Sequence, residues 1–340
     1  MRERLRLLRV IRAAPAVALA LMLSGIAWPQ SVQNPRRLAD GLPGQLLVTD
    51  RHFGAIVAVD ERTLEPIWSF TLPNEGAPFG LATWNRLVYV GNTKTRNVEV
   101  YRIVFTPTGD PSLRFEYNLG GTPPGEIGSI GNPVSIAIDS RERLAFVLDG
   151  AVRGIEIFDW QGARVGGFEP ADETGSLLSP VSVAVDETRC ELLVSDYGDP
   201  SGSFSSRSPA RILIFDYEGT LLTRITGDGS THATTNFVRV QGVATTTDGR
   251  IFAAEPLAGQ ILVLARETGE LLETLGITGD APGELRLPLD VLLDGRTGDL
   301  FVSNNRGARR VETFRGVAPR RRFPGGRPAK LDPRAMGGRP

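Results

Sequence analysis

The chain has 340 residues, of which 41% are hydrophobic and 23% charged, so it can bury a large core. Its formal net charge of −1 is unevenly distributed, because both ends are rich in arginine and the body between them carries a net charge of about −12. An acidic body argues against nucleic acid as the main partner, since phosphate binding needs a basic face, and it favours a cationic partner or a metal ion.

Residues 1–28 have the pattern of a secretory signal peptide. A positively charged start is followed by an apolar run over residues 14–28, with small residues at Gly25 and Ala27 ahead of Trp28. The run is shorter than the roughly 20 residues of a membrane span. The sequence therefore predicts an exported protein, periplasmic or secreted, with no membrane span after cleavage. An uncleaved N-terminal anchor is the alternative.

A repeated order of short apolar strands occupies the middle of the chain. The third copy has strands at 133–139 (PVSIAID), 144–149, 154–159 and 163–168. The fourth copy repeats them at 180–186, 192–196, 211–216 and 221–225, and the fifth at 240–246, 251–255, 260–264 and 270–275. Weaker copies cover 46–72, 80–119 and 288–314. Each piece alternates as a short strand does, and 39 Gly and 24 Pro supply the turns. The pattern predicts an all-β protein.

These lines resemble the NHL repeat, in which a Pro-hydrophobic-Asp strand precedes a strand ending in Asp and an Arg-Ile-x-Val-Phe strand. Gly125-Glu126 and Gly283-Glu284 resemble the lead-in that often precedes this repeat. The resemblance covers about residues 44–314 and implies a six-bladed β-propeller over residues 31–315, with the first strand of each blade at the central channel. The first copy lacks an inner strand and the last an outer one, so either residues 31–43 or residues 316–324 close the ring.

The second strand of every copy ends in an acidic or amide residue. In a propeller these ends share one face, so the sequence predicts a ring of oxygen atoms there, and oxygen clusters suit Ca²⁺. The interpretation that we favour is that each side chain accepts hydrogen bonds from its own loop and shapes the turn, because it accounts for all six residues without an ion. The six residues are Asp50, Asn92, Asp149, Asp196, Glu255 and Asn304.

Two long loops, residues 197–209 and 226–237, are predicted on the same face. Most hairpin connections have roughly two to five residues, so these loops are the predicted contact surface for a partner. Their expected binding residues are Tyr197, Phe204, His232, Asn236 and Phe237.

The remaining features do not indicate chemistry. His52 and His232 are the only histidines, too few for the three-histidine metal set of the NHL-like lyases, and no Cys-x-x-Cys, nucleophile elbow or phosphate loop occurs. Cys190 cannot form an internal disulfide and is predicted to be buried or half-buried. Residues 316–340 are rich in Arg, Pro and Gly and are predicted to be a disordered tail.

We therefore expect an exported binding or scaffold protein without a cofactor, which recognises a protein or an extracellular polymer through its loop-rich face. The alternative is a Ca²⁺-dependent hydrolase or lyase of the six-bladed lactonase kind, in which the oxygen ring holds the ion.

Overall fold

The computed structural model describes residues 31–123, 128, 130–173, 175–198, 209–227, 237–307 and 310–319. The predicted signal peptide lies outside these residues, as do residues 320–340 of the predicted tail.

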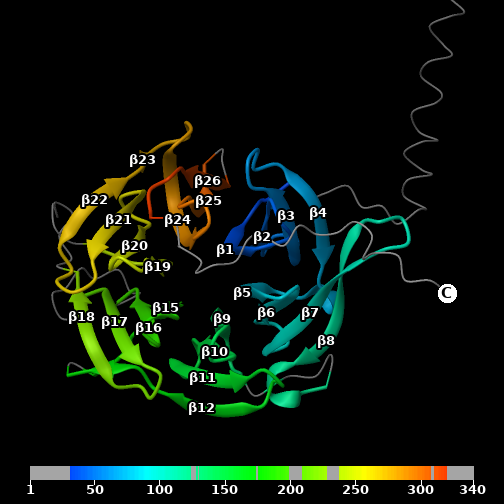
Figure 1. Ribbon diagram of the computed structural model, residues 1–340, viewed down its shortest axis with the longest axis horizontal. Helices are drawn as coiled ribbons and strands as arrows, with labels where there is room; N and C mark the ends of the chain where they lie inside the picture. Colours follow the sequence, from blue (N-terminus) through cyan, green and yellow to red (C-terminus); the bar gives the residue numbers. More distant parts are fainter. Residues whose placement is uncertain are drawn as a thin grey trace, which may run out of the picture.

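The chain forms six four-stranded sheets one after another around a common axis, and the strands are antiparallel except for one short parallel pair in the sixth sheet (Figure 1). In blades 1 to 5 the strands pair in chain order, from the channel to the rim. The first three blades comprise β1 (Pro35–Asp40), β2 (Gln45–Asp50), β3 (Ala55–Asp60) and β4 (Pro66–Thr71); β5 (Pro78–Trp84), β6 (Leu87–Asn92), β7 (Asn97–Phe105) and β8 (Pro111–Asn118); and β9 (Pro133–Asp139), β10 (Leu144–Asp149), β11 (Gly154–Asp159) and β12 (Arg164–Phe168).

The other three blades follow the same order. They comprise β15 (Pro180–Asp186), β16 (Glu191–Asp196), β17 (Arg211–Asp216) and β18 (Leu221–Thr226); β19 (Val243–Thr245), β20 (Arg250–Glu255), β21 (Gln260–Ala265) and β22 (Leu271–Leu275); and β24 (Glu284–Leu293), β25 (Leu300–Arg306) and β26 (Val311–Phe314), with β23 (Ile277–Thr278) beside the start of β24. A two-residue hairpin, β13 (Ala171–Asp172) with β14 (Gly175–Ser176), lies between blades 3 and 4, and short 3₁₀ turns follow β4 and β8 at Pro73–Glu75 and Leu119–Gly121. The protein is a six-bladed β-propeller.

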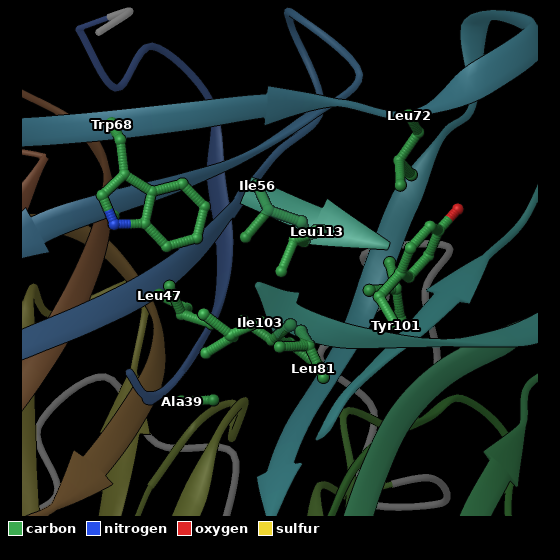
Figure 2. Packing of buried hydrophobic residues seen from close by; sticks show 12 residues of the cluster. Ala39, Leu47, Ile56, Trp68, Leu72, Leu81, Tyr101, Ile103 and Leu113 are labelled. Carbon is green, nitrogen blue, oxygen red and sulfur yellow. The ribbon is translucent and has the colours of Figure 1, made fainter. Parts of the chain in front are cut away.

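The hydrophobic core lies between the blades. Second and third strands such as β2 are buried on both faces because a neighbouring blade covers each face, whereas outer strands such as β12 are largely exposed. Figure 2 shows one such interface, where Leu47, Ile56 and Trp68 of blade 1 face Leu81 and Tyr101 of blade 2. Burying such side chains stabilises the fold by about 1.5–3 kcal/mol each.

Residues 31–43 supply the strand that completes the ring. β1 forms the inner strand of blade 1 and lies against blade 6, where Ser303 Oγ donates to the Arg36 carbonyl at 3.1 Å and Asn305 Nδ2 donates to Asn34 Oδ1 at 2.6 Å. The chain after β26 turns away, and the Ala318 N–H donates to the Gly298 carbonyl at 3.0 Å. Within the described residues, no fourth strand pairs with the outer edge of β26.

Cys190 differs from its predicted state. The thiol is exposed, because Cys190 occupies the turn before β16 with a φ of 54° and the strand begins one residue later, at Glu191. The prediction of a buried or half-buried thiol was wrong.

Candidate functional site: the channel mouth and the loop face

The predicted ring residues all lie on second strands and are all buried. Their exposed fractions are 2% or less, and five of the six end their strand, while Asn304 lies within β25. We call the end of the propeller where these residues lie the loop face. The six members are Asp50, Asn92, Asp149, Asp196, Glu255 and Asn304.

Each ring side chain accepts hydrogen bonds from nearby backbone. Asp149 shows the arrangement most clearly. Its Oδ2 accepts the Gly131 N–H at 2.6 Å, and its Oδ1 accepts the N–H groups of Asn132 at 2.8 Å and Ala151 at 2.9 Å. Two of these donors precede the inner strand and one follows the second strand. The carboxylate therefore joins the loop that leads into a blade to the first turn within that blade.

The other ring positions repeat this bonding. The principal donors are the N–H groups of Gln33 and His52 to Asp50, of Ala77 and Lys94 to Asn92, of Leu178, Ser179 and Gly198 to Asp196, of Arg239 and Ala258 to Glu255, and of Arg286 to Asn304. In five blades a proline starts the inner segment and pairs with the ring residue. Proline has no N–H, so the ring side chain is left to bond the residues before it.

The ring does not form a common centre. None of the six side chains lines the axial cavity, which inner strands surround. In the part of the chain that the structure describes, no three His, Cys, Asp or Glu residues are grouped so that they could hold a metal ion. Burial also raises the pKa of Glu255 above its ordinary value, although backbone N–H groups oppose the shift. The six side chains therefore fit the favoured interpretation of turn formation better than Ca²⁺ coordination, and the binding of Ca²⁺ at the ring stays an untested alternative.

Arg37 crosses the channel near the loop face. We call this end of the channel the channel mouth. Its Nη1 forms an ion pair with Asp290 Oδ1 of blade 6 at 2.7 Å, its Nε donates to the Val134 carbonyl of blade 3 at 3.3 Å, and its Nη2 donates to the Val181 carbonyl of blade 4. Asp290 also accepts the Leu38 N–H at 2.9 Å. One guanidinium thus joins blades 1, 3, 4 and 6.

A cavity of about 240 Å³ lies along the axis and is lined by the inner strands of all six blades. Arg37 and Asp290 belong to its wall, and much of the rest is small or aliphatic, as at Ala39, Ala137 and Ala184. Gly242 opposes Asp290, where a Cβ atom would lie 2.5 Å from the carboxylate oxygen. The glycine therefore leaves room for the ion pair.

The two long loops are joined at their bases. The Gly227 N–H donates to the Ala210 carbonyl at 2.8 Å, and the Arg239 guanidinium lies over the Tyr197 ring at 5.0 Å from its centre. The first loop connects β16 with β17, and the second connects β18 with β19. The loops therefore start from neighbouring points on the loop face.

The structure describes two of the five predicted binding residues. Tyr197 is half-buried on the loop face. Phe237 was predicted to be an exposed anchor, but it is 1% exposed and packs in the core between blades 4 and 5, so that prediction was wrong. Phe204, His232 and Asn236 lie outside the described residues.

Comparisons with known proteins support the fold only. A chain of the hydrazine synthase of Kuenenia stuttgartiensis is 14% identical, with a TM-score of 0.55 over 82% of this chain and 76% of that chain. A Bacteroides thetaiotaomicron protein of unknown function is 14% identical, with a TM-score of 0.62 over 85% and 70%, and the WD40 propeller domain of Doa1 is 14% identical, with a TM-score of 0.52 over 82% and 78%.

No protein family model matches the chain, and no curated protein matches it. The resemblance to NHL repeats therefore stays a prediction, while the propeller fold is confirmed. Propellers carry many unrelated functions, so the fold leaves the activity open. In the described residues, no helix is long and apolar enough to cross a membrane.

Sequence reasoning missed the arginines at the channel mouth. Arg36 and Arg37 open β1 in the segment Pro-Arg-Arg-Leu-Ala-Asp, which does not follow the repeat pattern. An alignment of the repeats could have revealed them. Arg36 and Arg37 occupy the positions at which the third copy has Val134 and Ser135, which are small or apolar.

Proposed function

We propose that the protein is an exported, non-catalytic binding or scaffold protein that recognises a protein partner through its loop face. The observation that carries the proposal is the pair of long loops whose bases are joined by the Gly227 to Ala210 hydrogen bond. A rigid ring that carries the bases of two long loops next to each other is a common way to build a recognition surface. The signal pattern of residues 1–28 supports export.

The geometry of the mouth supports binding over catalysis. The ring carboxylates are engaged by backbone N–H groups, and Arg37 is held by Asp290 and two carbonyls. These groups are already satisfied, so they act as structural parts of the ring and leave recognition to the loops and the exposed surface around them.

Replacement of residues 199–208 and 228–236 by short Gly-Ser turns tests the proposal. We expect the thermal melt to stay nearly unchanged, because Phe237 and Ala210 remain in the core, and we expect cross-linked capture of the partner from an envelope extract to be lost. The matched control replaces the exposed turn 106–110, between β7 and β8 at the opposite face, and should capture as the unaltered protein does. Retained capture by the loop variant would refute the proposal.

The calcium-dependent alternative predicts a different result. An ion that binds the folded state alone stabilises it by about 2.7 kcal/mol when its concentration is 100 times its Kd. We expect no change of melting temperature when a chelator or millimolar Ca²⁺ is added. A rise with Ca²⁺ that the chelator reverses would favour the metal-dependent enzyme.

A further inference from the structure

Most deeply buried arginines of this protein are paired with carboxylates. Arg37 pairs with Asp290, Arg266 Nη1 with Glu267, and Arg211 with both Asp172 and Asp196. Such pairing is the rule, because an unpaired charge inside a protein is costly. It makes an arginine without a carboxylate stand out.

Arg36 is half-buried and has no carboxylate partner among the described residues. Its Nε is fully buried and has no hydrogen-bond partner, and its guanidinium lies over the Phe79 ring at 5.4 Å from the ring centre. Arg51 lies over the same ring, also at 5.4 Å. Among the described residues, neither guanidinium forms an ion pair or donates a hydrogen bond. The half-buried Arg36 and the exposed Arg51 therefore share one aromatic ring, and neither has a counterion there.

The electrostatics at this place are unfavourable in the unliganded protein. Burial lowers the pKa of Arg36, and the neighbouring charges of Arg51 and Arg37 lower it further. Both effects disfavour the charged form, yet arginine keeps its charge in proteins. An anion bound next to Arg36 would oppose both effects, because it supplies the missing acceptor and offsets the repulsion from Arg51 and Arg37.

The surroundings indicate which anion fits. Arg36 is the second residue of its inner segment, and the corresponding residues in the other blades are mostly apolar: Phe79, Val134, Val181, Gln241 and Leu289. Val134 and Leu289 are buried, whereas Phe79 and Val181 are half-buried, so the mouth offers two cationic groups beside these two apolar side chains. This mixture suits a peptide that carries both carboxylate and apolar side chains better than a uniformly polar polyanion.

We propose that Arg36, Arg51 and Phe79 form a carboxylate-binding site at the channel mouth, which takes an acidic side chain of an apolar-acidic peptide segment. The inference deepens the proposed function and rests on it, since it names the chemistry of the partner that the loop face recognises. Planar guanidinium groups bind carboxylates through paired N–H donors, and the Phe79 ring holds them in place.

Titration with a synthetic peptide tests the site. The probe is a hexapeptide that alternates glutamate with leucine, and its control has glutamine in place of glutamate. We expect the full chain at about 50 mM salt to bind the glutamate peptide at least about tenfold more tightly, as expected for hydrogen bonds to a charged group. The R36Q/R51Q double variant should lose this preference. Its melting temperature should stay the same or rise, because an unpaired charge is removed.

The R62Q/R86Q double variant is the matched control. It makes the same charge change at exposed arginines in turns of the opposite face, and it should bind as the unaltered protein does. Equal binding of both peptides, or an unaffected R36Q/R51Q variant, would overturn the proposal. Equally tight binding of polygalacturonate, or displacement of the peptide by an equal concentration of inorganic phosphate, would overturn the assignment to a peptide.

The loop variant separates this inference from the proposed function. Its mouth arginines are unchanged, so it should still bind the glutamate peptide while it loses partner capture. If the peptide fails to bind and the loop variant still loses capture, the carboxylate site is wrong and the proposed function stands. If the loop variant keeps capture while the peptide binds through Arg36 and Arg51, the loops are not the recognition surface.

Discussion

Replacement of Asp290 by alanine should lower the free energy of unfolding by about 3–5 kcal/mol, which corresponds to a fall in melting temperature of roughly 10 °C. Arg37 would lose its carboxylate partner while its side chain stays buried, and the Leu38 N–H would lose its acceptor. Because Arg37 joins four blades across the channel, the change acts on ring closure. Thermal and urea unfolding of the variant measure the effect.

A second variant tests the cause of this loss. Arg37→Met with Asp290→Asn removes both charges and keeps an oxygen for the Leu38 N–H, so most of the stability should return. Glu75→Ala is the control, because Glu75 pairs with Lys94 at the surface, where a broken ion pair costs at most about 1 kcal/mol. If Asp290→Ala cost no more than this control, Arg37 would be solvated and the channel open to water.

The repeat and its strands were predictable from the sequence because each strand carries its own signal. Residues 133–139 and 180–186 were predicted within their observed bounds, since alternating apolar residues fit a half-buried strand and a terminal aspartate starts a turn. Asp159 is an example of a terminal aspartate that starts a turn, since its Oδ1 accepts the N–H groups of Gln161 and Ala163. Strands and turns that depend on neighbouring residues can therefore be predicted from the sequence.

The channel mouth was not predictable, because it depends on contacts between distant positions. Arg37 and Asp290 are 253 residues apart in sequence, and nothing in either segment indicates the other. The net charge of the body also gives no sign of the mouth. An acidic body favours a cationic partner, whereas Arg36 and Arg51 place two cationic groups beside Phe79. The prediction that Phe237 binds a partner was wrong for a related reason. The sequence does not show whether an apolar residue at the end of a loop faces the solvent or the core.

Replacement of Asp149 by alanine should lower the free energy of unfolding by about 3 kcal/mol, because three backbone N–H groups would lose the buried carboxylate that accepts them. Asp149→Asn should cost less, about 1–2 kcal/mol, since the amide oxygen can still serve Asn132 and Ala151 while Gly131 loses its partner. This order follows from counting acceptors and requires no metal ion.

Asp159→Ala is the matched control in the same blade. Asp159 ends β11 and accepts two backbone N–H groups, but its turn is exposed, so water replaces the lost acceptor and the cost should stay near 1 kcal/mol. Unfolding in the presence of a chelator and of Ca²⁺ separates the two interpretations of the ring. A structural acceptor gives the same loss for Asp149→Ala under both conditions. If Asp149 were a calcium ligand, Asp149→Ala would lower the free energy of unfolding in the presence of Ca²⁺ and not in the presence of the chelator. That result would support a calcium site at the ring.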